Sequence, residues 1–220
     1  MLLLLLQHAR EEINKILRAD QYQQNRLKIF ATLTKLRQIC CDPSILDEKY
    51  QNESAKLDAL RDIFADLAGS GHKILIFSQF TTVLKRIETI VQKLNLKYLY
   101  LDGKTRSESR AMMTQKFNED KTISVFLISL KAGGVGLNLT AADVVIHFDP
   151  WWNPSIENQA TDRAHRIGQQ STVQVIKLIA KGTAIQNDKQ AVIEAILNNN
   201  LENSNFTKFS ETELRDILEL

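Results

Sequence analysis

Five short runs of almost continuous apolar residues most constrain the fold of this chain. They are Ile74–Phe77, Tyr98–Leu101, Val125–Ser129, Val144–Phe148 and Val173–Ile179. The segments between them that have helical spacing are Val83–Leu94, Arg106–Phe117 and Ile156–Ile167. Runs that are apolar throughout are typical of strands buried on both faces, and intervening helices provide the crossovers that a parallel sheet requires. The sequence therefore predicts a layered α/β domain with a parallel central sheet.

Helical patterns also lie on both sides of this region. From Arg26 to Ile39 apolar residues recur every third position, and they are Leu27, Phe30, Leu33 and Leu36. Pro43 ends this pattern, and a second helix is predicted over Ala55–Leu67 with Ser54 as its N-cap. Capping boxes, Thr105–Glu108 and Ser210–Glu213, are predicted to open two further helices.

Charge is unevenly distributed along the 220 residues. The net charge of +2 divides into +1 for residues 1–53, +5 for residues 54–182 and −4 for residues 183–220. These segments are also the expected domains: a helical extension, the α/β domain and a helical tail. The basic middle segment permits a polyanionic partner without requiring one.

Composition argues against several classes of protein. A hydrophobic content of 44% argues against disorder, and two cysteines argue against a disulfide scaffold. Because Cys40 and Cys41 are adjacent and no histidine is near them, no structural metal is expected, and a reducing intracellular compartment is the simpler interpretation. The apolar stretch Met1–Leu6 is far shorter than the roughly 20 residues that span a bilayer, so no membrane is expected as a partner. The histidines are scattered, and no local nucleophile signature is present.

Unusual residues follow the predicted strands, at the edge where ligands gather in parallel α/β sheets. Gly103-Lys104-Thr105 is similar to the end of a P-loop, but Tyr98 stands where that motif requires glycine. The remaining interpretations are a tight turn, or a turn whose Thr105 hydroxyl and Lys104 hold a nucleic-acid phosphate. The glycines 133, 134 and 136 beside Lys131 indicate either a tight turn or a phosphate contact.

The helix predicted at Ile156–Ile167 carries two arginines near its apolar stripe. Its buried residues are predicted to be Ile156, Ala160, Ala164 and Ile167, with Thr161, Asp162 and His165 on the opposite side. Gln159, Arg163 and Arg166 border the stripe. Arginines in such positions snorkel, pair with buried carboxylates, or bind an anion brought by a partner.

Two adjacent tryptophans precede this helix. Trp151 and Trp152 lie between Pro150 and Pro154, and at least one ring is expected to face a neighbouring domain or ligand. A hydrophobic plug over the sheet edge is as probable for either ring singly.

Five segments closely resemble the C-terminal helicase lobe of SWI/SNF-type superfamily-two ATPases, over about residues 26–182. They are Leu36–Pro43 (LRQICCDP), Ile74–Phe80 (ILIFSQF), Ile128–Leu139 (ISLKAGGVGLNL), Asp149–Pro154 (DPWWNP) and Gln159–Gln169 (QATDRAHRIGQ). DEAD-box helicases share the lobe, but their last motif typically reads HRxGRxGR. The resemblance implies a RecA-like three-layer domain with a mostly parallel central sheet, an N-terminal helical extension and C-terminal helices.

The resemblance also implies roles for individual residues. Arg163 and Arg166 resemble arginine fingers that act on ATP, and Gln159 would orient the nucleotide or the attacking water. Further nucleotide-site residues implied are Gly134, Gly136 and Asn138. Residues implied to contact double-stranded DNA are Ser78, Gln79, Lys104, Thr105, Lys131, Gly133, Trp151 and Trp152.

The same resemblance implies that this chain is half of an enzyme. The P-loop and the DExH carboxylates that hold Mg²⁺ belong to the family's first lobe and are absent here. The chain alone is therefore expected to hydrolyse no ATP and to need that first lobe as its partner. The alternative is a catalytically silent nucleic-acid-binding or regulatory lobe, and a Rossmann-type enzyme is disfavoured because no strand is followed by G-x-G-x-x-G.

Two features concern the ends and the source of the chain. Ala184–Lys189 departs from the acidic helix that usually follows in the family, which puts a bracing helix across the lobe in doubt. The sequence ISLKAGG favours a bacterial source. The expected location is the cytoplasm or nucleoid in bacteria, or the nucleus in eukaryotes.

Overall fold

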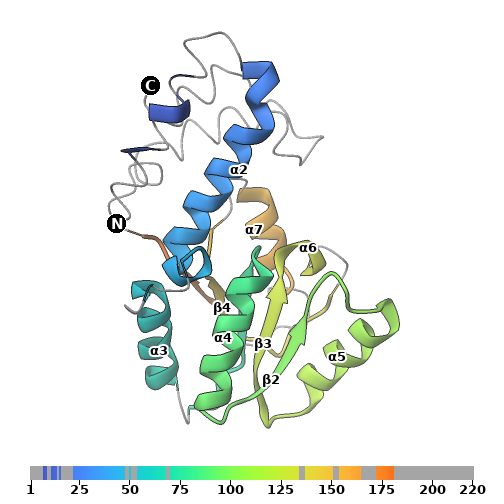
Figure 1. Cartoon of the computed structure of the whole chain (residues 1–220). Helices are drawn as coiled ribbons and strands as arrows, with labels where there is room; N and C mark the ends of the chain where they lie inside the picture. Colours follow the sequence, from blue (N-terminus) through green and yellow to red (C-terminus); the bar gives the residue numbers. More distant parts are fainter. Residues whose placement is uncertain are drawn as a thin grey trace. The chain divides into compact units, whose positions relative to one another are not determined.

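The computed structural model of the protein describes residues 7–8, 11–13, 15, 22–47, 50, 54–67, 70–133, 137–150, 154–164 and 172–180 (Figure 1). The chain divides into two compact units, residues 52–179 and residues 1–51 with 180–220. The strands of the first unit are β1 (Ile74–Ser78), β2 (Lys97–Leu101), β3 (Ile123–Ser129), β4 (Val144–His147) and β5 (Gln174–Lys177). Its helices are α3 (Ala55–Leu67), α4 (Thr81–Lys93), α5 (Ser107–Glu119), α6 (Leu130–Gly133) and α7 (Pro154–Thr161).

The five strands form one sheet in the order β2-β3-β1-β4-β5, and every neighbouring pair is parallel. Each apolar run predicted to be a strand is a strand, which confirms the α/β class with its parallel sheet. The register pairs Ser78 with Ser129, Phe77 with His147 and Leu101 with Ile128. The carboxyl ends of β2, β3, β1 and β4 therefore lie along one edge in that order.

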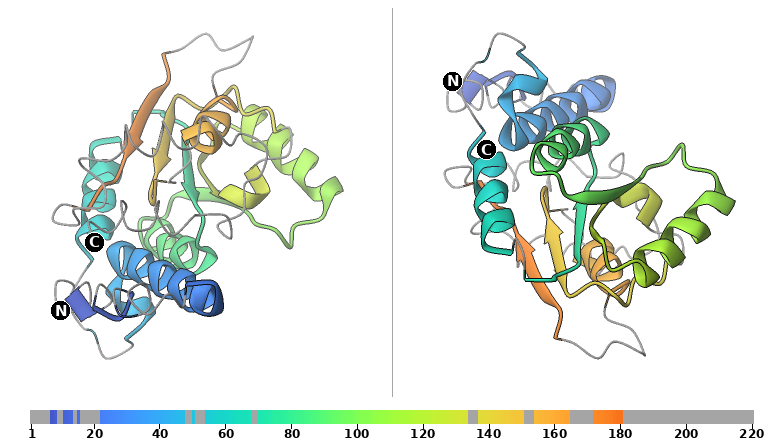
Figure 2. Two further views of the ribbon diagram at one scale, coloured as in Figure 1. Left: turned by 90° about the horizontal axis from the view of Figure 1, so that it is seen from above. Right: turned by 90° about the horizontal axis from the view of Figure 1, so that it is seen from below.

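Helices cover both faces of the sheet and give three layers. Figure 2 shows α3 and α4 on one face and α5, α6 and α7 on the other. Successive side chains of a strand point to opposite faces, so Leu75 and Phe77 of β1 pack in one cluster with Phe117 of α5 and Ala160 of α7. Phe117 and Phe126 pack at 5.3 Å between ring centroids. Full burial of such a side chain stabilises the fold by about 1.5–3 kcal/mol.

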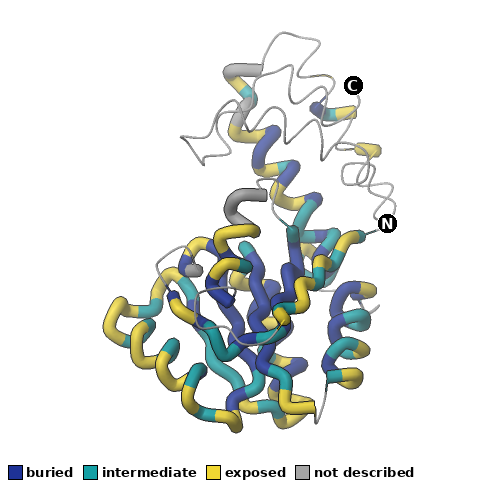
Figure 3. The backbone as a smooth tube through the Cα atoms, turned by 180° about the vertical axis from the view of Figure 1, so that it is seen from behind, coloured by how far each residue is buried: buried dark blue, intermediate teal, exposed yellow. Residues whose placement is uncertain are grey.

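Burial separates the central strands from the edge strands. Every residue of β1 and β4 is buried, and so is nearly all of β3, whereas β2 and β5 are mostly half-buried or exposed. Figure 3 shows this buried centre between helices whose outer sides are exposed. Burial on two faces thus explains the apolar runs of β1, β3 and β4, whereas the expectation of such burial was wrong for the edge strands β2 and β5.

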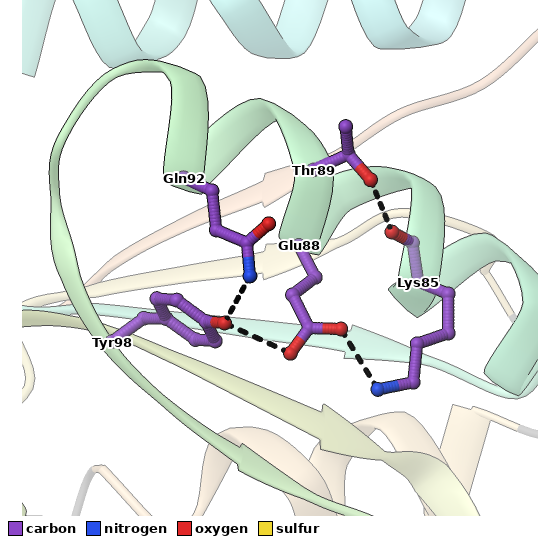
Figure 4. A network of polar contacts seen from close by, with 5 residues as sticks. All are labelled: Lys85, Glu88, Thr89, Gln92 and Tyr98. Atoms are coloured by element: carbon purple, nitrogen blue, oxygen red, sulfur yellow. Dashed lines mark hydrogen bonds and ion pairs between the residues drawn. The ribbon is translucent and has the colours of Figure 1, made fainter.

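A polar network fastens the edge strand β2 to α4 (Figure 4). The Tyr98 hydroxyl donates to Glu88 at 3.0 Å and accepts from Gln92 at 2.7 Å, and Lys85 Nζ lies 2.8 Å from Glu88. Lys85 also lies 4.0 Å from the ring centroid of Tyr100. The hydrogen bond to Glu88 raises the pKa of Lys85, and burial raises the pKa of Tyr100. These polar contacts hold the half-buried strand β2 against α4 in addition to apolar packing.

A buried lysine closes the opposite, amino edge of the sheet. Lys73, directly before β1, is 9% exposed, and its ammonium group donates to the carbonyls of Phe117 and Asp120, the latter at 3.0 Å. Its backbone N–H donates to Asp143 at 2.9 Å, and Asp143 lies 2.7 Å from His72 Nδ1. Burial lowers the pKa of Lys73. Lys73, His72 and Asp143 are therefore all bonded within the fold at this edge.

In the smaller unit, the predicted helix Arg26–Ile39 is the longer helix α2 (Tyr22–Cys41). Of the apolar stripe, Phe30, Leu33 and Leu36 are buried, whereas Leu27 is 78% exposed. A repeat of apolar residues identifies one face of a helix but not how much of that face is covered. Among the described residues, no helix is both long and apolar enough to span a membrane.

The predicted capping box at the start of α5 was also wrong. The N-cap is Arg106, which makes no side-chain capping bond, and the helix begins at Ser107. The Thr105 hydroxyl instead accepts a hydrogen bond from the Asp102 N–H at 3.1 Å. Threonine bonds nearby backbone groups in turns as readily as at helix ends. The box predicted at Ser210–Glu213 and the unusual segment Ala184–Lys189 lie outside the described residues.

Candidate functional site

Three exposed basic side chains lie along the carboxyl edge of the sheet. Lys104 and Arg106 follow β2, and Lys131 lies in α6, which follows the adjacent strand β3. In the described part of the chain, none of these three side chains makes an ion pair or a hydrogen bond. Unpaired, solvated cations on neighbouring loops are suited to contact phosphate groups.

The loop after β2 is shaped by Asp102. Its carboxylate accepts the Lys104 N–H at 2.9 Å, and the Thr105 hydroxyl donates to the same oxygen at 3.4 Å. The Thr105 carbonyl accepts from Arg110 Nε at 2.9 Å. A side chain added at Gly103 would meet nothing within 4 Å. The loop is thus a turn held by aspartate that presents Lys104 to solvent, and both interpretations given to it from the sequence stay open.

The loop after β1 is held from β4 by a buried carboxylate. Asp149 is 4% exposed, and its oxygens accept the Gln79 N–H at 3.1 and 3.3 Å. The hydroxyl of Ser78, which is fully buried, accepts the Phe80 N–H at 3.1 Å. Ser78 therefore closes the turn into α4, and DNA contact by Ser78 or Gln79 stays a prediction.

A buried lysine fixes the start of the tryptophan loop. Lys56 of α3 is 8% exposed, and its ammonium group donates to the Phe148 carbonyl at 3.0 Å. The same ammonium lies 5.8 Å from the centroid of the Phe148 ring. Trp151 and Trp152 themselves lie outside the described residues. The structure thus describes how the chain enters this loop.

Helix α7 is shorter than predicted. It begins with Pro154, where the fixed φ of proline suits a first helical position, and it ends at Thr161 instead of Ile167. Arg163 and Ala164 follow in a turn whose N–H groups bond the carbonyls of Ala160 and Thr161, three residues back. The backbone beyond Thr161 therefore does not continue the helix that the spacing predicts.

Most described side chains of α7 and of the turn after it agree with the predicted stripe. Ala160 and Ala164 are buried, Asp162 and Gln159 are exposed, and Arg163 is only 5% exposed. The placement of Thr161 opposite the core was wrong. Its hydroxyl lies 3.0 Å from Nε2 of the buried His147, whose ring stacks on Phe77 at 5.7 Å. Because His147 ends β4, the end of α7 lies at the carboxyl edge of the sheet.

The backbone of Arg163 is tied to the segment after the glycines. Its carbonyl accepts the Leu139 N–H at 2.9 Å. Asn138, which precedes Leu139, has an exposed side chain. Gly133 is the last residue of α6, whereas Gly134, Gly136 and Arg166 lie outside the described residues. The structure thus joins the turn that holds Arg163 to the segment that leaves the glycine-rich loop.

Sequence reasoning did not identify Asp149, Lys56 or His147 as residues that shape this edge. Asp149 could have been suspected, since a carboxylate that directly follows a buried strand needs donors nearby. Lys56 and His147 gave no such signal, because each lies inside an otherwise ordinary helix or strand pattern.

Comparisons with known proteins agree with this architecture. The family model described as the helicase conserved C-terminal domain matches residues 55–168. The solved Sulfolobus solfataricus SWI2/SNF2 ATPase C-terminal domain is 30% identical with a TM-score of 0.75, and the match covers 100% of this chain and 93% of that one. The chain belongs to the SWI2/SNF2-type helicase C-terminal domains. The RecA-like fold that the resemblance implied is thereby confirmed.

Further similar proteins come from bacteria, archaea and fungi. An uncharacterized ATP-dependent helicase of Mycoplasma genitalium is 41% identical over 89% of this chain and 19% of its own length. Helicase swr1 of Schizosaccharomyces pombe is 44% identical over 62% of this chain and 11% of its own length. The Sulfolobus solfataricus SWI2/SNF2 ATPase core in complex with double-stranded DNA has a TM-score of 0.77 at 32% identity, covering 98% of this chain and 47% of that one. The chain spans about a fifth or less of these curated relatives.

Proposed function

We propose that this SWI2/SNF2-type domain is the second lobe of an ATP-dependent translocase on double-stranded DNA. It supplies Arg163 and Arg166 to a nucleotide held by a first lobe, and it contacts one DNA strand. The observation that carries this proposal is the position of Arg163. A guanidinium-bearing residue that is 5% exposed lies at the same sheet edge as the exposed Lys104 and Lys131.

DNA contact is assigned to the loops at the carboxyl edge. Lys104 and Lys131 attract phosphates without regard to base sequence. The loops that carry Gln79, Thr105 and Gly133 lie at the same edge and are proposed to contact the same DNA strand. A structure of a related SWI2/SNF2 ATPase core in complex with double-stranded DNA supports a duplex as the ligand. Trp151 and Trp152 are proposed to lie against the DNA or the first lobe.

ATP chemistry is assigned to the end of α7 and the residues directly after it. A guanidinium group binds phosphate oxygens through two parallel N–H bonds, so Arg163 and Arg166 fit the charge that develops on the γ-phosphoryl group. Such a group contributes on the order of 10³ or more to the rate of phosphoryl transfer. The exposed Gln159 is proposed to orient the nucleotide or the attacking water. Gly134, Gly136 and Asn138 link this region to the DNA-contacting loop.

Mg²⁺ is assigned to the first lobe. Across the described ranges, no group of three or more His, Cys, Asp or Glu side chains could hold a metal ion. When bound with ATP, Mg²⁺ neutralises phosphate charge. The residues of this chain would orient the nucleotide and stabilise the transferring phosphoryl group.

The test is a DNA-stimulated ATPase assay on two proteins, this chain alone and a two-lobe protein in which it follows a first lobe. We expect turnover only from the two-lobe protein. Turnover by this chain alone would contradict the proposal. Equal turnover by two-lobe proteins with and without Arg163 and Arg166 would favour the alternative, a catalytically silent nucleic-acid-binding lobe.

A further inference from the structure

Asn118, near the end of α5, binds the segment that leaves the glycine-rich loop through both ends of its carboxamide. Nδ2 donates to the Asn138 carbonyl at 2.8 Å, and Oδ1 accepts the Ala141 N–H at 3.2 Å. Because one partner is a carbonyl and the other an N–H, these contacts also fix which carboxamide atom is nitrogen. Asparagine is the shortest side chain that carries a donor and an acceptor on separate atoms, so its role here is specific.

The residues that Asn118 binds lie on either side of Leu139. Leu139 is fully buried, its carbonyl accepts the Ala142 N–H at 3.1 Å, and its own N–H donates to the Arg163 carbonyl at 2.9 Å. Three elements that are distant in sequence are therefore joined by consecutive hydrogen bonds. The order is α5, the segment 138–142 and the turn that holds Arg163.

We propose that Asn118 is a positioning residue for ATP hydrolysis, which sets the place of Arg163 through Leu139. The proposal rests on the function proposed above, since it assigns importance to where the Arg163 guanidinium lies. An arginine that acts on a transition state must be held to within a fraction of an ångström, and displacement by about 1 Å can lower a rate by 10²-fold. The same bonds hold Asn138 and Ala141, which come after the glycine-rich loop in the chain, so the proposed role of Asn118 includes linking the DNA-contacting loop to the nucleotide.

The end of α5 has contacts besides those of the Asn118 side chain. The end of α5 is already held by Phe117, which is fully buried against Phe126 and whose carbonyl binds Lys73. Asn118 is only partly buried. Its removal is therefore expected to loosen the segment 138–142 and to leave the helix in place.

The test compares three variants of α5 in the two-lobe protein. Asn118→Ala removes both hydrogen bonds, and Asn118→Asp keeps the shape while replacing the donor to Asn138 with a charged acceptor. Gln115→Ala is the matched control, because Gln115 lies on the same helix and, among the residues that the structure describes, its carboxamide bonds only Glu119 of that helix, at 2.9 Å. The readouts are kcat and KM for ATP at saturating DNA, the affinity for DNA, and hydrogen exchange at the Leu139 amide.

We expect both Asn118 variants to lower kcat by about 10-fold to 100-fold, with KM for ATP and DNA affinity within about twofold of the parent. Exchange at the Leu139 amide should rise by about 10-fold, and Gln115→Ala should change none of these. Arg163→Ala, measured in parallel, distinguishes failure of the Asn118 inference from failure of the proposed function. If it collapses kcat while both Asn118 variants keep the parental value, the Asn118 inference is overturned alone. If Arg163→Ala leaves kcat unchanged, the proposed function fails, and the route from Asn118 to catalysis fails with it.

Discussion

The two edges of the sheet differ in how their charged side chains are bonded. At the amino edge, Lys73 binds two backbone carbonyls and Asp143 binds both His72 and the Lys73 N–H. At the carboxyl edge, Lys104 and Lys131 extend into solvent. Each edge also holds a lysine of the other kind, since Lys56 at the carboxyl edge is buried on a carbonyl and Lys97 at the amino edge is exposed. The comparison teaches that burial and bonded partners, together with the edge, indicate whether a lysine serves stability or ligand contact.

The largest expected effect on activity comes from a substitution of Arg163, which lies at the carboxyl edge. In the two-lobe protein, Arg163→Ala should lower kcat of DNA-stimulated ATP hydrolysis by about 10³-fold, because the developing phosphoryl charge loses a partner. DNA affinity should stay within about twofold. Arg61→Ala is the control, since Arg61 forms a surface pair with Asp58 one turn away on α3. Turnover that survives in Arg163→Ala would contradict the assignment of Arg163 to the nucleotide.

A second prediction sets the two edges against each other directly. The double variant Lys104→Ala/Lys131→Ala should weaken DNA binding about 10-fold and reduce the slope of log affinity against log salt by about 2, because each lysine is expected to neutralise one phosphate. Filter binding or anisotropy over a salt series measures both quantities.

The matched control removes the same charge from the amino edge. Lys97 begins β2 and Lys121 lies two residues before the start of β3, and both side chains are exposed. Lys97→Ala/Lys121→Ala should leave the salt slope close to the parental value. Equal weakening by the two double variants would mean that net charge, and not the edge, governs DNA binding.

A smaller effect, on stability, is expected from a substitution of Lys73 at the amino edge. Lys73→Met keeps the apolar stem but leaves the carbonyls of Phe117 and Asp120 without this donor, which should lower the free energy of unfolding by about 1–3 kcal/mol. Urea unfolding of the chain measures this as a lower midpoint. The ATPase activity of the two-lobe protein should be unchanged, and an unchanged midpoint would mean that this contact contributes nothing to stability.

The smallest expected effect is a pH dependence at the same lysine. Burial lowers the pKa of Lys73 from its ordinary value of 10.5. In the window just below pH 10.5 the unfolded chain therefore binds more protons at this site than the folded chain, so this contribution to stability rises with pH. The stability advantage of the parent over Lys73→Met should grow as pH increases towards 10.5. An advantage that shrinks over this window would contradict the direction of the shift.

Much of the fold was predictable because burial on two faces leaves a direct trace in sequence. Ile74–Phe77 and Val144–Phe148 needed only their apolar runs to be identified as strands. Prediction failed where contacts between distant segments determine where a helix ends. Periodicity continued the last described helix to Ile167, but α7 ends at Thr161, and the Arg163 carbonyl in the turn that follows bonds the N–H of Leu139, 24 positions earlier.

The candidate site was predictable in part. Strand order and direction bring the loops after β1, β2, β3 and β4 to one edge, as expected from their positions after apolar runs. The residues that shape these loops could not be predicted, because Asp149, Lys56 and Asn118 each bind backbone groups from a distant segment. A side chain that bonds to backbone groups cannot be matched to its partner from the sequence, because nearly every residue offers the same N–H and carbonyl.

Binding of a transition-state analogue tests the central claim most directly. If Arg163 stabilises the transferring phosphoryl group, a two-lobe protein should bind ADP with aluminium fluoride far more tightly than ADP, because catalysis depends on stronger binding of the transition state. Arg163→Ala should lower the affinity for the analogue by about 10³-fold and leave the affinity for ADP within about twofold. Equal affinity of the parent and Arg163→Ala for the analogue would contradict the claim that this lobe completes the ATP site of its partner.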